Sequence, residues 1–481
     1  MGEPDKAKRS SARLMFIVSS NVEKVDPVTR KQIRSHVMRG KRQKKDVKQA
    51  MSLANSGSHI GTPKTPANLE QVMRTYAPLL PRTIRFDLSF TADEMDAFMA
   101  LNMVDVSMIA IKVMFPLMMA IGFQADSQET CPYSRGPSPI SRGPIDPAAL
   151  HIAAFTVYGF IDRILRRQDK FTNPAAMLHF QKGLKLLRER LLGPDDEIKL
   201  SDTTIGTVLK LASHAHFEGD YQASKQHMEG LRKMVDLRGG LPVFTGNKLL
   251  VEMLRCDLSI ALHSGSKPVF FRQPLELVPE YPDTLLRACS DASCAHDKIE
   301  LFCEMNHDLA MAWRVMRRFC LLVNLGTQIQ RLIYPEIIVE TMTAVMYRLL
   351  HMEFVTGSVD EVIRLGLLAF CHHIFLQWQD IRLPYYRFPM DYRDCILGVG
   401  PSQRLPPRVM LWLLMTGAIS LYDTSDEAWL REALREYADG CQVKSWKEMQ
   451  EILKSFMWVV LLDEQRGRQI YNLLYQDKEK G

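Results

Sequence analysis

Apolar residues recur every three to four positions through most of the chain that follows residue 147. Leu184, Leu187 and Leu191 show this spacing, and so do Met228, Leu231 and related positions further on, whereas alternating apolar and polar runs of strand type are scarce. The pattern predicts an all-α fold class. Later helices are predicted at about 295–323, 335–350, 359–380, 406–420, 426–438 and 445–461.

One pair of predicted helices has clear start and stop signals. Ser201 or Asp202 is a suitable N-cap, and Glu218-Gly219-Asp220 interrupts the apolar spacing. Gly239-Gly240 then ends the second helix, because glycine enters the left-handed backbone region without steric cost. These signals predict a helical hairpin, similar to those of helical repeat arrays. We therefore expect a large irregular helical domain built of packed helical hairpins.

Composition divides the chain into three regions. Residues 1–50 form a basic tail, with a short extended segment at 16–18 and a basic helix after it. Residues 51–82 are rich in Ser, Gly, Thr and Pro, which is typical of a linker. Residues 83–481 are predicted to form the helical domain, interrupted by a proline-rich surface loop at 124–147.

Overall composition is that of an ordinary folded chain. Its 481 residues are 46% hydrophobic and 24% charged, which excludes collagen-like and fully disordered proteins. Nine cysteines without a Cys-x-x-Cys pair exclude a disulfide scaffold and favour a reducing compartment. The polar N-terminus lacks the apolar stretch of a secretory signal. The most apolar window, Met108 to Phe123, is too short to span a membrane, so we expect a buried helix and no membrane contact there.

Positive charge is concentrated in the tail. The whole chain has 61 Lys+Arg and 55 Asp+Glu, a net charge of +6. Residues 1–50 hold 14 basic and 5 acidic residues, net +9, which leaves 47 and 50, net −3, for the remaining chain. Nine cations lie within nineteen residues, and they are Arg30, Lys31, Arg34, Arg39, Lys41, Arg42, Lys44, Lys45 and Lys48.

This basic block fits several roles. It can act as a nuclear import signal through residues 41–45, contact nucleic-acid phosphates, lie on an anionic membrane, or serve only as a solvated tail. No aromatic residue interleaves with the cations, which argues against a stacking platform for single strands. Nuclear import and phosphate contact are the two interpretations that we carry forward.

Candidate chemistry elsewhere is sparse. The group Cys289, Cys294, His296, Cys303 and His307 lacks the short paired spacings of zinc ligands, so we expect ordinary core or surface residues there. The segment from Gly240 to Lys248 superficially resembles a phosphate-binding loop, but its spacing differs and no predicted strand precedes it. Nothing in the sequence pairs a nucleophile with a base. We therefore expect no metal, no cofactor, no catalytic residue and no enzymatic activity.

An ordered set of short stretches resembles one known family. The stretches are the Val28–Lys48 block, His227–Leu231 with Leu237–Leu241, Cys256–Leu258 with Gly265–Phe270, and Ser445–Glu448 with Phe456–Trp458. In order and spacing they are similar to the fungal-specific transcription factor domain proteins. The resemblance implies an α-helical regulatory domain in a nuclear regulator, often of a secondary-metabolite pathway. The residues that match in this way are Arg238, Gly239, Gly240, Asp257, Pro268, Trp446 and Trp458.

Each matching residue also has a structural interpretation. Gly239 and Gly240 end a helix, and the Asp257 carboxylate is placed where it could pair with Arg238. Trp446 and Trp458 are expected to anchor the last helices. All of these are roles in holding the fold together.

One departure from the family limits the inference. The usual zinc binuclear cluster, with six cysteines, is absent, since the first cysteine is Cys131. DNA binding is therefore not carried over, and DNA would be reached through the basic tail or a partner protein. We expect a nuclear transcription regulator of a fungal metabolic pathway with a protein partner. The alternative is a helical scaffold or accessory factor of a biosynthetic pathway that does not bind DNA. The oligomeric state stays open.

Overall fold

Capped, amphipathic segments of the sequence form the helices in this chain. The computed structural model describes residues 146–160, 174–272, 278–290, 305–329, 333, 335–377, 387–399, 405–422 and 427–476. Within these ranges the regular elements are helices and no β-strand occurs, which confirms the all-α prediction. The basic tail, the linker and nearly all of the 124–147 loop lie outside the described residues, as do Cys294, His296 and Cys303.

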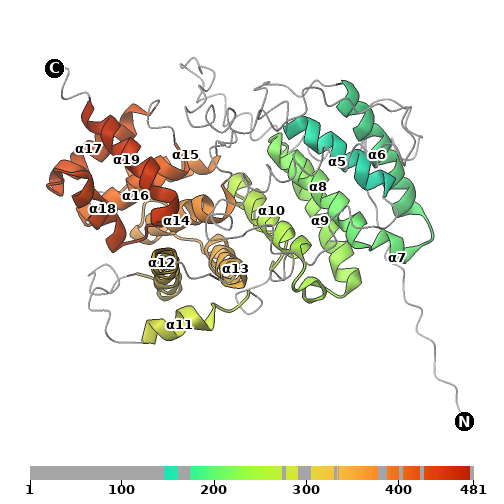
Figure 1. Ribbon diagram of the computed structural model, residues 1–481, viewed down its shortest axis with the longest axis horizontal. Coiled ribbons are helices and arrows are strands. Elements are labelled where there is room, and N and C mark those ends of the chain that lie inside the picture. Colours follow the sequence, from blue (N-terminus) through green and yellow to red (C-terminus); the bar gives the residue numbers. More distant parts are fainter. Residues whose placement is uncertain are drawn as a thin grey trace, which may run out of the picture. The chain divides into compact units, whose positions relative to one another are not determined.

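The first group of helices packs as neighbouring hairpins (Figure 1). Helix α5 lies against α6 and α8, and α8 lies against α9 and α10. The bounds are α5 Pro147–Phe160, α6 Pro174–Leu192, α7 Asp196–Lys199, α8 Asp202–Phe217, α9 Tyr221–Arg238, the 3₁₀ helix η4 Leu241–Phe244 and α10 Lys248–Ser264.

The predicted hairpin of α8 and α9 is confirmed in detail. Ser201 accepts a hydrogen bond from the Thr204 amide at the start of α8, which is N-cap geometry. Asp220 caps α9 in the same way, after the predicted break. Gly239 follows with φ 114°, so the chain leaves the helix through a conformation that favours glycine.

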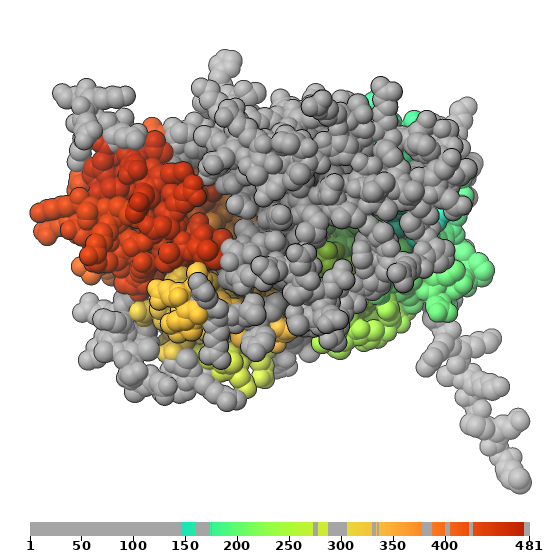
Figure 2. Space-filling view, in the orientation of Figure 1, coloured from blue at the N-terminus to red at the C-terminus, as the bar shows by residue number. Residues whose placement is uncertain are grey.

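The second group of helices surrounds α16. Helix α14 contacts α12, α13, α15 and α16, and α16 contacts α17, α18 and α19. Figure 2 shows the residues of the C-terminal helices gathered in one red cluster. The bounds are α11 Asp283–Ser290, α12 His307–Gln328, α13 Pro335–His351, α14 Val359–Cys371, the π-helical turn η8 His372–Leu376, α15 Arg387–Leu397, α16 Pro407–Ser420, α17 Ala428–Gly440, α18 Trp446–Ser455 and α19 Val460–Gln476.

Most predicted helix ranges agree with the structure, and one is wrong. The range 445–461 is two helices, because α18 ends at Ser455 and α19 begins at Val460. The intervening residues leave the helix so that their backbone groups can bond to side chains of distant helices. Further differences are smaller: α12 begins at His307 with Asn306 as its N-cap, and α14 passes into a π-turn after Cys371.

Large aromatic residues fill the core around α16. Trp313 on α12 and Trp412 on α16 are each 1% exposed, and their rings meet nearly edge to face at 5.0 Å. Phe456 lies within 6.3 Å of both rings. Such pairs add stability beyond the apolar area that they bury. Helix α16, which carries Trp412, also contributes to the site described next.

Candidate functional site: a histidine–serine chain and an adjoining pocket

The π-turn η8 directs two adjacent histidines into different surroundings. Its backbone closes with a 2.7 Å hydrogen bond from the Gln377 amide to the His372 carbonyl, five residues back. His372 is buried at 9% exposure and faces the core, whereas His373 is half-buried and lines a pocket. Single π-turns of this kind often occur at functional positions.

Five buried or half-buried polar side chains form a continuous chain through the core. His216 Nε2 lies 2.9 Å from Ser259 Oγ, and this oxygen lies 3.3 Å from His263 Nδ1. His263 Nε2 lies 3.2 Å from His372 Nε2. His372 Nδ1 lies 3.1 Å from Ser420 Oγ, which donates to the Ala369 carbonyl at 2.7 Å. The chain thus ties α8, α10, α14, η8 and α16 together.

One assignment of protons satisfies all of these contacts with every ring neutral. The chain ends at a carbonyl, which only accepts, so the hydroxyl of Ser420 donates to it and accepts from His372 Nδ1. His372 Nε2 then accepts from His263 Nε2. His263 Nδ1 accepts from Ser259, whose oxygen accepts from His216 Nε2. In this assignment every donor in the chain points toward the Ala369 carbonyl.

Burial keeps these imidazoles in the neutral form. It lowers the pKa of His216 and of His372 to about 3. For His372 the neighbouring His373 and His216 add to the effect. The pKa of His263 is also well below its ordinary value, because of burial first and then the nearby His372 and His216. An added proton on His372 Nε2 would place two donors face to face, so protonation would break the chain.

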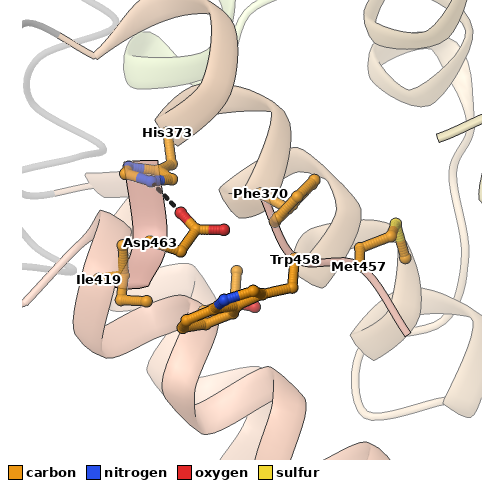
Figure 3. A pocket seen from close by; sticks show the side chains of 7 residues that line it. Phe370, His373, Ile419, Met457, Trp458 and Asp463 are labelled. Carbon is orange, nitrogen blue, oxygen red and sulfur yellow. Dashed lines mark hydrogen bonds and ion pairs between the residues drawn. The ribbon is translucent and has the colours of Figure 1, made fainter. Parts of the chain in front are cut away.

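A small pocket lies on the other side of the π-turn (Figure 3). Its cavity volume is about 10 Å³, and it opens to solvent. Its walls come from α14, η8, α16, α19 and the segment between α18 and α19, and they are formed by Phe370, His373, Thr416, Ile419, Met457, Trp458 and Asp463.

His373 and Asp463 form the polar wall of this pocket. His373 Nε2 lies 2.7 Å from Asp463 Oδ1, and His373 Nδ1 lies 2.7 Å from Gln377 Oε1. The second carboxylate oxygen of Asp463 accepts the Val459 amide at 2.7 Å. A general base needs a ring nitrogen directed at its substrate, and both nitrogens of His373 are engaged within the protein. The pair is therefore arranged for positioning rather than for proton transfer to a substrate.

Distant side chains hold the segment between α18 and α19. Trp412 Nε1 donates to the Met457 carbonyl at 2.9 Å. Asn324 donates to the Trp458 carbonyl at 2.7 Å and accepts the Val460 amide at 2.9 Å. These bonds replace the helical bonds that the segment gives up, which is why the predicted single helix is interrupted here.

The expected pairing of Asp257 with Arg238 is wrong. Asp257 is 1% exposed and accepts from the amides of Val269 at 2.7 Å and Phe270 at 2.9 Å, and from the Tyr347 hydroxyl at 2.9 Å. Burial nevertheless raises its pKa to about 6, although these three bonds oppose the shift. The carboxylate faces inward on α10 and so holds the loop after α10 instead of reaching the surface of the α8–α9 hairpin.

Arg238 belongs to a separate network at the end of the α8–α9 hairpin. Its guanidinium donates to the Leu200 carbonyl at 3.1 Å and pairs with Asp202. Asn247 donates to the other oxygen of Asp202 at 2.9 Å. Arg238 also lies over the Phe244 ring, 4.7 Å from its centroid. The network ties the start of α8 to the end of α9 and to η4.

The predicted anchoring role of the two tryptophans agrees with their contacts. The rings of Trp446 and Trp458 meet at 6.1 Å, and both lie over Gly467 of α19. A Cβ atom at Gly467 would lie only 2.6 Å from Trp458. Pro268 is buried in the loop that Asp257 holds. The nine cations of the tail lie outside the described residues.

Sequence reasoning missed the histidine–serine chain as a unit. No local pattern in the sequence links His216, His372 and His373 to one another or to Ser259, His263, Ser420 and Asp463. One signal was available, since His263 lies among apolar residues of α10. These residues are buried, and so is His263. A histidine in such a position requires a hydrogen-bond partner, although the sequence does not say which one.

Two features of the described residues bear on the candidate chemistry. No group of three or more His, Cys, Asp and Glu side chains in these ranges is placed to hold a metal ion. No helix in them combines the length and apolar character required to cross a bilayer. His307, at the end of the cysteine- and histidine-rich stretch, has an 83% exposed side chain at the start of α12.

Comparison with known proteins adds no relative. No protein-family model, no curated protein and no solved structure matches this chain.

Proposed function

We propose that this chain is a nuclear regulator of transcription that acts through a helical regulatory domain and a basic N-terminal tail. The observation that carries the proposal is that the positive charge of the chain is concentrated in the tail and not in the helical body. The tail has a net charge of +9, whereas the remaining chain, which includes every described helix, has a net charge of −3. Such a tail suits an import receptor or DNA phosphates, and a helical body suits a protein partner.

The contacts within the helical body support a non-enzymatic role. His216, His263 and His372 are hydrogen-bonded within one chain, and His373 and Asp463 bond to each other. Asp257 is engaged with two backbone amides and a tyrosine hydroxyl. These groups hold helices together, which is the work of a binding or regulatory domain. By resemblance to the fungal-specific transcription factor domain proteins, the regulated genes would belong to a fungal metabolic pathway, including secondary metabolism.

The import function is tested by replacing Lys41, Arg42, Lys44 and Lys45 with Ala in the full chain. We expect loss of nuclear accumulation of a fluorescent fusion, because the variant removes the densest part of the basic block. The control replaces Lys233, Lys447 and Lys454, which are exposed on the helical body. Unchanged accumulation of the tail variant would contradict the import role.

The same pair of variants tests DNA contact. Binding to mixed duplex fragments is measured across a salt series, with sequencing of the retained DNA. We expect retention that weakens with salt and is lost in the tail variant, because counterion release drives phosphate contacts. Retention of one defined sequence would make the tail a sequence reader. No retention by the unmodified chain would contradict direct DNA binding and favour a scaffold or accessory factor.

A further inference from the structure

The pocket beside His373 contains a hydrogen-bond donor that no described group satisfies. Trp458 is 3% exposed, and its Nε1 finds no partner among the described residues. In Figure 3 this nitrogen lies on the edge of the indole that is turned toward Asp463. Two other indoles of this region are satisfied, since Trp412 donates to Met457 and Trp446 donates to Glu464. A buried indole N–H normally has an acceptor, so this one requires an explanation.

The Trp458 indole cannot turn away to find an acceptor within the protein. Asn324 bonds to the Trp458 carbonyl and to the amide two residues later, and Trp412 bonds to the preceding carbonyl. The ring itself is packed over Gly467 and against Trp446. The N–H is therefore presented to the pocket by a fixed backbone and a fixed ring, which is the preorganisation expected of a binding site.

Charge and shape narrow the kind of group that the pocket accepts. Asp463 contributes a carboxylate, which repels an anion placed beside it, and this carboxylate already has His373 as its partner. Phe370, Ile419 and Met457 make most of the other wall apolar, and Thr416 adds one hydroxyl, so a second ion of either sign is disfavoured. A neutral group that accepts from the indole and donates to the carboxylate matches these walls. A hydroxyl does both with a single oxygen.

We propose that this pocket binds one neutral hydroxyl group, whose oxygen accepts from Trp458 Nε1 and whose proton is donated to the Asp463 carboxylate. The cavity volume of about 10 Å³ is room for about one water molecule. The hydroxyl is therefore that of a water molecule entering from solvent. The inference goes beyond the proposed function and does not depend on it.

The experiment follows the Trp458 indole in the full chain labelled with ¹⁵N-tryptophan. Its N–H signal is assigned from the Trp458→Phe variant, and the signals of Trp412 and Trp446 serve as internal controls because both indoles already have acceptors. Magnetisation transfer from water to the Trp458 N–H detects a bound water. Titration with 2-propanol detects an alcohol, and titration with acetate tests whether an anion enters.

Each outcome either supports or overturns the proposal. Transfer from a long-lived water at Trp458, but not at Trp412, supports the site with water as its occupant. Absence of this transfer overturns the proposal. A saturable shift of the Trp458 signal by 2-propanol or by acetate in the millimolar range, with the control signals unmoved, also overturns it, because the occupant would then be larger than a water molecule or charged. Because the assay requires neither DNA nor nuclei, its failure is distinct from failure of the proposed function.

Discussion

Mild acid is expected to destabilise this protein, because the histidine–serine chain holds its imidazoles in the neutral form. Burial lowers the pKa of His216 and of His372 from 6.5 to about 3. A histidine whose pKa falls on folding binds protons more tightly in the unfolded chain. Its contribution to stability is therefore complete above the unfolded pKa of about 6.5 and is lost as the pH falls from there toward the folded pKa.

The magnitude follows from these pKa values. Between about pH 7.5 and pH 5, each histidine with a folded pKa near 3 reduces the free energy of unfolding by about 2 kcal/mol, so His216 and His372 together reduce it by about 4 kcal/mol. Asp257 opposes them, because burial raises its pKa to about 6. A raised carboxyl pKa favours the folded state as the pH falls, which restores about 1 kcal/mol over the same interval. The expected net loss from these three groups is about 3 kcal/mol. The lowered pKa values of His263, His151 and His227 add to this loss.

Urea unfolding of the full chain, followed by circular dichroism across this pH interval, measures the loss. His372→Gln removes one titrating group, so the free energy lost on acidification should shrink by about 2 kcal/mol, whatever the stability of the variant at neutral pH. His307→Gln is the matched control, because the His307 side chain is 83% exposed and lies outside the histidine–serine chain. Equal stability at both pH values, or an unchanged pH dependence in His372→Gln, would refute the reasoning.

Two further predictions concern one packing contact and one hydrogen-bonded carboxylate. Gly467→Ala should lower the free energy of unfolding by about 1–3 kcal/mol, because the new Cβ would lie 2.6 Å from Trp458 and 2.8 Å from Trp446. Gly440→Ala is its control, since no atom lies within 4 Å of a Cβ there, and equal urea midpoints for the two variants would contradict the packing argument. Asp257→Asn should cost about 2 kcal/mol at neutral pH, because an amide cannot accept all three bonds that the carboxylate accepts. Tyr347→Phe, which removes one of the three, should cost about 1 kcal/mol, and a larger loss than that of Asp257→Asn would show that the hydroxyl and not the carboxylate organises the loop.

Local signals in the sequence were sufficient to predict many of the helices and several of their ends. Ser201 caps α8 through its own neighbour Thr204, and Gly239 ends α9 through its own backbone dihedrals. Both interactions involve residues within a few positions of one another, so the information lies in the sequence near each site. The apolar spacing that predicts a helix is local for the same reason.

The candidate site could not be predicted from local sequence signals, because the residues that form it are distant from one another in the chain. His263 meets His372 across 109 residues, and His373 meets Asp463 across 90. Asp257 illustrates the same limit, since its place one helix after Arg238 allowed that pairing, yet its carboxylate faces inward to a loop and to Tyr347.

The sequence by itself therefore determined the fold class, the main helices and the concentration of positive charge in the tail. Only the tertiary structure decided that 445–461 breaks into two helices, because Asn324 and Trp412 supply the hydrogen bonds that the broken segment loses. It also decided which histidines form hydrogen bonds with each other. Both outcomes depend on which helix faces come together, and a buried polar group accepts whichever partner that packing brings within reach.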